Sequence, residues 1–84
     1  MFAVGTFLQS ANFRDARFGK LSNFAGTNFF GSVVFSYACF SGNTDFTQSH
    51  FWEKTEFWDS VFGKAAYFQF IVCEKKVDFR HAVF

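Results

Sequence analysis

The sequence predicts an all-β fold, a β-solenoid of about four coils with roughly 22 residues in each coil. Three observations predict it: the spacing of the phenylalanines, a column of small residues in phase with them, and turn-forming residues in between. Phenylalanine provides 17 of the 84 residues, whereas leucine and isoleucine together provide only three. Such a bias is typical of one structural position that is repeated along the chain.

All but two of the phenylalanines follow one register, in which steps of five and six residues alternate along the chain. The one gap falls on Cys73, and only Phe30 and Phe70 lie outside the register. The phenylalanines in register are Phe2, Phe7, Phe13, Phe18, Phe24, Phe29, Phe35, Phe40, Phe46, Phe51, Phe57, Phe62, Phe68, Phe79 and Phe84. If four steps make a coil, as the family resemblance described below implies, residues 22 positions apart are expected to stack at about 4.8 Å, the spacing of neighbouring strands.

Each register position ends a short segment that alternates inward, outward and inward, as a half-buried strand does. The residue two positions earlier is small or β-branched, with Ile71 as the largest, and the residue between is often polar. The Gly, Ser, Asp, Asn and Lys residues that follow predict turns. The expected strands are residues 5–7, 11–13, 16–18, 22–24, 27–29, 33–35, 38–40, 44–46, 49–51, 55–57, 60–62, 66–68, 71–73, 77–79 and 82–84.

A repeat of two steps also fits a right-handed coiled coil. Residues five apart on an α-helix, however, point about 140° apart, so successive phenylalanines would face different sides. The glycine, threonine, asparagine and aromatic content is also poor for a helix. The strand interpretation is therefore preferred.

The coil length also predicts which side chains are neighbours. Inside, Cys73 is expected to be buried and unreactive above Phe51. Outside, Glu53 lies next to Lys75, and Trp58 lies where a cation–π contact with Arg80 can form. These neighbours follow from positions one coil apart in the sequence.

Several units resemble those of the pentapeptide-repeat protein family, whose loose pattern is small, Asn or Asp, Leu or Phe, and two variable residues. ANFRD, SNFAG, TDFTQ and VDFRH match this pattern closely, and TNFFG fits once the following Ser32 is set aside. VVFSY, AYFQF and IVCEK are the weakest units, and the five-and-six alternation resembles a phenylalanine-rich subset of the family. The resemblance covers essentially the whole chain. It implies a right-handed quadrilateral β-helix.

The chain is expected to be one domain, residues 1–84, and a fragment of a longer repeat array, because no helix, proline or charged segment covers either end. No apolar run reaches the roughly 18 residues of a transmembrane helix. The N-terminus lacks the charged and apolar regions of a signal peptide. Together with two cysteines that are too far apart for a paired motif, these features favour a cytoplasmic location.

The sequence predicts no enzyme. It contains no nucleophile motif, phosphate-binding loop or metal cluster of recognised spacing, so we expect no catalytic, cofactor-binding or metal-binding residues. His50 and His81 have no cysteine or carboxylate at ligand spacing. Cys39 points outward with no base near it. Glu56 and Asp78 form a like-charged pair in adjacent coils, which we interpret as solvated surface because no third ligand accompanies it.

Aromatic side chains outside the inward ladders predict an interaction surface. Leu8, Phe30 and Trp52 form one outward column, and further rings are scattered along the chain. The candidate interaction residues are Phe30, Tyr37, Trp52, Trp58, Tyr67 and Phe70. Corner packing, or relaxed selection on the repeat, accounts for these rings equally well.

The expected function is that of a structural scaffold or protein–protein interaction module, whose partner is another protein or a second copy bound end to end. The formal net charge of +1 argues against a nucleic-acid-binding face. The resemblance implies an alternative, since some family members imitate DNA and bind type II topoisomerases, protecting against quinolones. That role uses a strongly acidic surface, which this chain lacks. An ice-binding solenoid needs outward threonines, whereas Thr27, Thr44 and Thr55 fall in the inward column.

Overall fold

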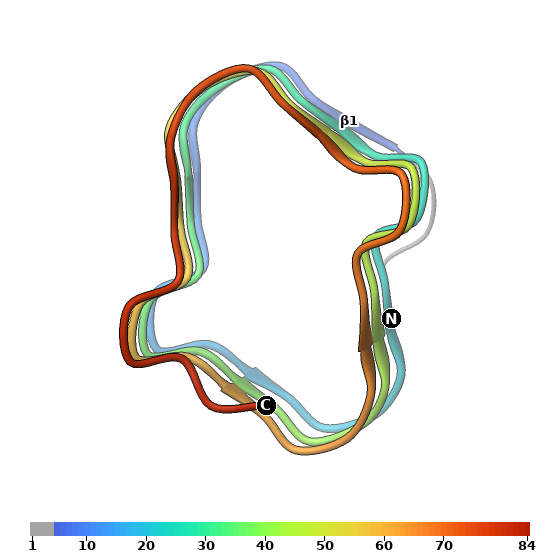
Figure 1. Cartoon of the computed structure of the whole chain (residues 1–84), viewed down its shortest axis with the longest axis vertical. Helices are drawn as coiled ribbons and strands as arrows, with labels where there is room; N and C mark the ends of the chain where they lie inside the picture. The colour runs from blue at the N-terminus through green and yellow to red at the C-terminus, as the bar shows by residue number, and fades with distance from the viewer. Residues whose placement is uncertain (1–4) are drawn as a thin grey trace.

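The computed structural model describes residues 5–84 and shows a β-solenoid, which confirms the expected fold class (Figure 1). The predicted place of Phe2 in a ladder lies outside the described residues. Seen from the C-terminal end, the chain runs counter-clockwise towards the viewer, so the solenoid is right-handed. Within residues 5–84 the regular elements are strands of two residues, and no helix is long and apolar enough to cross a membrane.

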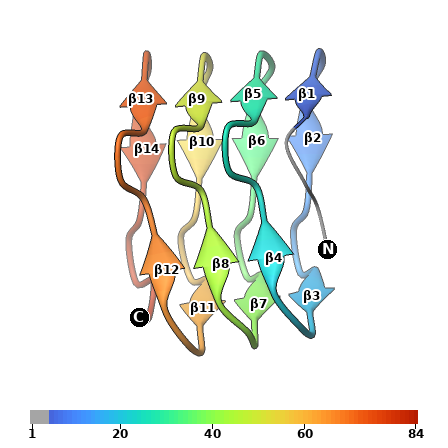
Figure 2. The ribbon, with the colours of Figure 1, turned by 90° about the vertical axis from the view of Figure 1, so that its right-hand side faces the viewer.

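Four parallel sheets form the sides of the solenoid (Figure 2). The first sheet consists of β1 (Thr6–Phe7), β5 (Asn28–Phe29), β9 (His50–Phe51) and β13 (Val72–Cys73). The second consists of β2 (Ala11–Asn12), β6 (Val33–Val34), β10 (Thr55–Glu56) and β14 (Val77–Asp78). The third consists of β3 (Arg17–Phe18), β7 (Cys39–Phe40) and β11 (Val61–Phe62), and the fourth of β4 (Ser22–Asn23), β8 (Thr44–Asp45) and β12 (Ala66–Tyr67).

The strand register confirms the predicted coil length. Thr6 pairs with Asn28, and Asn28 pairs with His50, so each sheet joins residues that are one coil of 22 residues apart. Two sheets have four strands and two have three, and the described chain therefore completes three coils and part of a fourth.

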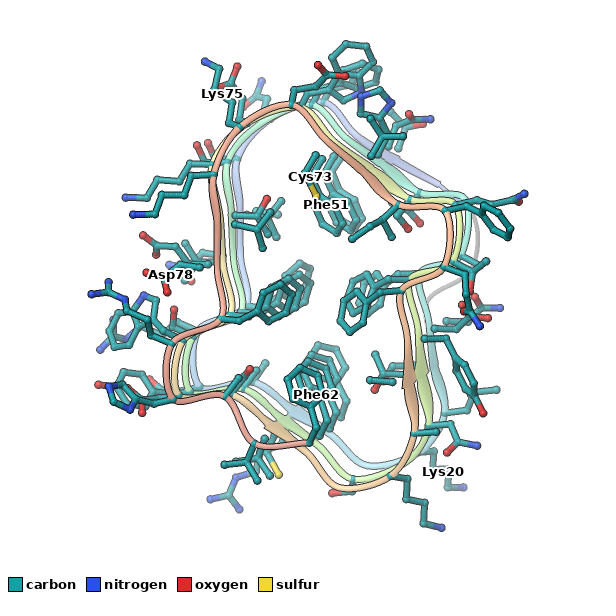
Figure 3. The ribbon with its side chains drawn as sticks, in the orientation of Figure 1. Lys20, Phe51, Phe62, Cys73, Lys75 and Asp78 are labelled. Carbon is teal, nitrogen blue, oxygen red and sulfur yellow. The ribbon has the colours of Figure 1, made fainter. Side chains whose placement is uncertain are left out.

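The interior is filled by ladders of phenylalanine rings, as the register predicts (Figure 3). Successive rings of a ladder are nearly parallel, with centroids 4.7 to 5.3 Å apart. Rings of different ladders meet edge to face, as Phe35 and Phe46 do at 5.5 Å and 81°, or tilted, as Phe35 and Phe40 do at 5.8 Å and 48°. The rings that are at most 2% exposed are Phe24, Phe29, Phe35, Phe40, Phe46, Phe51, Phe57 and Phe62. Apart from Phe24, whose neighbour in the preceding coil lies outside the described residues, each of these rings has a coil on both sides.

The alternation of five and six residues corresponds to two kinds of corner. The described five-residue steps contain β-turns, and six of these turns are closed by a backbone hydrogen bond, such as that from the N–H of Ala38 to the C=O of Phe35 at 3.0 Å. The third residue of each such turn has a φ between 58° and 68°, the left-handed value that a type II turn requires. The six-residue steps place the additional residue in a wider bend with no positive φ. The tight turns project from the outline in Figure 1.

Phe70 occupies one of these left-handed positions, which a bulky residue tolerates poorly. Its φ is 60° and its side chain is 80% exposed, so packing offsets little of the backbone cost. A left-handed conformation costs a residue with a Cβ about 1–2 kcal/mol, whereas glycine adopts it freely. We expect Phe70→Gly to raise the free energy of unfolding by about 1 kcal/mol, measured by urea denaturation.

Gln69→Gly is the matched control, because Gln69 precedes Phe70 in the same turn and does not have a positive φ. A glycine there only adds freedom to the unfolded chain, so the free energy of unfolding should fall by roughly 0.5–1 kcal/mol. Shifts of the same sign in the two variants would contradict the left-handed turn at Phe70.

Candidate functional site

Asparagine and aspartate side chains cap four of the tight turns, each from the outward position one residue before the phenylalanine that begins the turn. In each case Oδ1 accepts a hydrogen bond of 2.8–2.9 Å from the N–H two residues later. The capping residues are Asn12, Asn23, Asp45 and Asp78. Such bonds give a turn amide its partner and favour the turn over extended structure. The sequence shows that polar residues often precede the phenylalanines in register. Their role in capping the turns becomes visible only in the structure, which shows where the turns lie.

Asp78 has a strongly lowered pKa. Its carboxylate accepts hydrogen bonds from Nε of Arg80 at 3.0 Å and from Nη2 at 2.7 Å. These side-chain bonds, together with the bond from the backbone N–H of Arg80, lower the pKa of Asp78 to about 2. Glu56, the expected like-charged neighbour, lies in register with Asp78 and contacts Lys54 at 3.2 Å. Each carboxylate of the pair therefore has its own cation (Figure 3 labels Asp78).

Acid should destabilise the chain as Asp78 takes up a proton. Its pKa in the folded chain is about 2, below the ordinary aspartate value of about 3.9. The ionised carboxylate therefore stabilises the fold fully above pH ~4, and this contribution is lost as the pH falls towards ~2. We expect the melting temperature of Asp78→Asn to fall less over this interval than that of the wild type.

Asp15→Asn is the control for this pH dependence, because the carboxylate of Asp15 is exposed and contacts Arg14 only at 3.7 Å. Its acid-induced fall in melting temperature should match that of the wild type. An unchanged pH profile in Asp78→Asn would show that another carboxylate is responsible.

Four of the six candidate interaction residues lie along the first and fourth sheets. Phe30 and Trp52 follow the first sheet in adjacent coils, with ring centroids 5.5 Å apart. Tyr67 lies in β12 and Phe70 in the next tight turn, on the side that faces the viewer in Figure 2. All four side chains are between 38% and 80% exposed.

His50 joins this group, although no role for it is evident from the sequence. Its ring lies parallel to that of Trp52, with centroids 3.9 Å apart. Its Nε2 lies 2.8 Å from Oε2 of Glu74. Glu74 lies one coil after Trp52. Applying the coil length to every set of outward residues one coil apart could therefore have indicated this contact from the sequence.

Tyr37 and Trp58 lie on a different corner, after the second sheet. Their rings meet edge to face at 5.0 Å, and Cζ of Arg14 lies 4.7 Å from the ring of Tyr37 and 5.5 Å from that of Trp58. The cation–π contact on Trp58 therefore comes from Arg14, because the guanidinium of Arg80 is bound to the carboxylate described above. Trp58, Arg80 and His81 line a hollow of about 260 Å³.

Both cysteines are free thiols. Cys39 is half-buried on the outer face of the third sheet, in register with Arg17 and Val61. Cys73 lies above Phe51 in the interior, but the expectation that it is buried is wrong: it is exposed, because no further ring covers it in the last coil (Figure 3). Partial burial against the coil below still raises the pKa of its thiol.

Within residues 5–84 no group of three His, Cys, Asp or Glu side chains is placed to hold a metal ion. No family model, curated protein or solved structure matches the chain. The fold and its side-chain contacts define a β-solenoid repeat protein, a class in which each coil completes the core of its neighbours.

Proposed function

We propose that this β-solenoid is a non-catalytic structural scaffold or protein–protein interaction module of the pentapeptide-repeat type. The observation that carries the proposal is that paired parallel strands hold the coils at a fixed spacing, while polar side chains on the outside contact one another across the coils. Lys75 contacts Glu53 at 3.3 Å and His50 contacts Glu74 at 2.8 Å, each across adjacent coils. Solenoids built in this way present extended surfaces that bind other proteins.

The exposed aromatic rings support an interaction role. Phe30, Trp52, Tyr67 and Phe70 lie outside the core, which the inward ladders complete without them. Aromatic side chains are enriched among the residues that dominate binding energy at protein interfaces.

The last coil offers a surface for a second copy of the chain. Phe84 is 69% exposed and stacks on Phe62 through one face, with centroids 4.9 Å apart. In the described chain β12, β13 and β14 each pair with a strand on one side only. Their free N–H and C=O groups can pair with another chain, and a second copy stacked end to end would cover both the ring and the strand edges.

Sedimentation velocity of the 84-residue chain over a wide concentration range tests this proposal. The sedimentation coefficient should rise with concentration in the wild type, whereas Phe84→Asp should remain monomeric because it places a charge on the stacking face. Phe30→Asp is the control, since Phe30 lies on a side of the solenoid, and it should associate as the wild type does. A wild-type chain that stays monomeric throughout would contradict end-to-end association.

A further inference from the structure

One side of the solenoid has no acidic residue. It consists of the outer face of the third sheet and the bend that follows, in residues 16–22, 38–44, 60–66 and 82–84, and we call it the basic face. Arg17, Lys20 and Lys64 lie on it, and Lys20 projects outward in Figure 3. The formal net charge of the chain is +1, so these three cations leave a net charge of −2 on the other residues.

The three cations of the basic face have no ion-pair partner among residues 5–84. Elsewhere on the described surface, every lysine and arginine except Lys76 contacts a carboxylate, at distances of 2.7–3.7 Å. These paired residues are Arg14, Lys54, Lys75 and Arg80. The cations on the basic face therefore remain available to a partner.

Lys20 and Lys64 occupy the same column two coils apart, and Gly42 lies between them. A Cβ at Gly42 would lie 2.7 Å from the backbone carbonyl carbon of Lys20, so this middle position has no space for a side chain. The two lysines are about 10 Å apart along the solenoid axis, at ~4.8 Å per coil. In a polyproline II segment, which has three residues per turn, carboxylates three residues apart lie on one face and are about 9 Å apart.

Uncharged hydrogen-bond donors lie beside Gly42. Ser41 and Asn43 are exposed on either side of the middle glycine. The Oδ1 atom of Asn43 accepts a hydrogen bond from the N–H of Ala65 at 3.3 Å, which leaves its amide N–H groups to donate outward. A carboxylate held between the lysines can therefore also accept hydrogen bonds from the bend.

Short aliphatic side chains adjoin the cations. Leu21 is 47% exposed, Val61 40% and Val83 56%. The exposed rings Phe30, Trp52, Tyr67 and Phe70 all belong to other sides. A membrane interface or a single-stranded nucleic acid is commonly held by such rings. The basic face instead combines cations with flat aliphatic area, which suits a protein segment.

We propose that the basic face binds an acidic segment of another protein in the polyproline II conformation, with carboxylates three residues apart and aliphatic side chains between them. The segment runs along the solenoid axis, where successive carboxylates meet Lys20 and Lys64 and its aliphatic side chains cover Val61. This inference rests on the proposed role as an interaction module and names the chemistry of one partner.

Fluorescence anisotropy with a labelled peptide of repeating Glu-Val-Ser tests the proposal. The peptide should bind the wild-type chain, and added salt should weaken the binding. Lys20→Glu combined with Lys64→Glu should weaken it about tenfold or more. The matched control combines Lys54→Glu with Lys76→Glu, which makes the same change in net charge on another side and should alter the affinity by less than about twofold. Equal melting temperatures of the two double variants show that both are folded.

Four results would overturn the proposal. The first is no binding of the Glu-Val-Ser peptide, and the second is an equal loss of affinity in both double variants. The third is binding of duplex DNA or of vesicles containing phosphatidylserine that depends on Lys20 and Lys64 more strongly than peptide binding does. The fourth, a Gln-Val-Ser peptide that binds as tightly as the acidic one, would remove the acidic partner but leave the interaction module intact.

Discussion

Replacing Phe35 with alanine is expected to lower the free energy of unfolding by about 3–5 kcal/mol, the largest effect of any single substitution proposed for this chain. Phe35 is fully buried, and its ring lies parallel to those of Phe13 and Phe57 with both centroids 5.0 Å away. It also meets Phe24 and Phe46 edge to face. Because paired strands hold the coils at a fixed spacing, the structure cannot collapse into the cavity that alanine would leave.

Urea denaturation measures this loss, with Phe70→Ala as the control. Phe70 is 80% exposed, so its truncation should change the free energy of unfolding by no more than about 0.5 kcal/mol. Small domains have only about 5–15 kcal/mol of stability in total, so Phe35→Leu provides a milder core change that leaves the chain folded. A Phe35→Ala variant as stable as Phe70→Ala would show that the ring does not lie in a core.

Gly31→Ala should have the next largest effect, a loss of about 1–3 kcal/mol in the free energy of unfolding, although it adds a single methyl group. A Cβ at Gly31 would lie 2.4 Å from the carbonyl carbon of Gln9 and 2.4 Å from the nitrogen of Ser10. Both atoms belong to the backbone of the preceding coil. They cannot move aside as the end of a side chain can, so the bend itself must shift.

Gly19→Ala is the matched control for this substitution. Gly19 also lies in a six-residue step, but no atom is within 4 Å of the Cβ that alanine would add. Its φ is not positive, so alanine adopts the same backbone and should be neutral or stabilising by up to about 1 kcal/mol. Thermal denaturation of the two variants distinguishes them, and equal melting temperatures would contradict the close approach of backbone at Gly31.

The core could be predicted from the sequence because one residue type marks it. Phe35 and Phe57 are one coil apart, and the alternating steps of five and six, with the four-step coil that the family resemblance implies, place them in the same inward ladder. The tight turns were harder to predict from the sequence. Glycine signals a positive φ only at Gly26, whereas Tyr37 and Phe70 adopt the same conformation with no local signal, because the strands on either side impose it.

The outward side chains were predicted less completely, because the coil length gives neighbouring positions but not the directions of long side chains. Trp58 was expected to contact Arg80, yet Arg14 reaches it from two coils away because the small Ser36 occupies the position between them. Cys73 was correctly placed above Phe51, but its exposure depends on what covers the last coil, which spacing does not show.

An engineered disulfide tests most directly the central claim that one coil takes 22 residues. Cys39 and Val61 are register partners on the outer face of the third sheet, where strands about 4.8 Å apart meet the Cα spacing that a disulfide needs. In a chain that carries Cys73→Ser and Val61→Cys, mild oxidation should join Cys39 to position 61 within one molecule, as peptide mapping would show. A second chain, with Cys73→Ser and Val72→Cys, should form no intramolecular bond, because Val72 lies on the first sheet. A bond from Cys39 to position 72, or none to position 61, would contradict the solenoid.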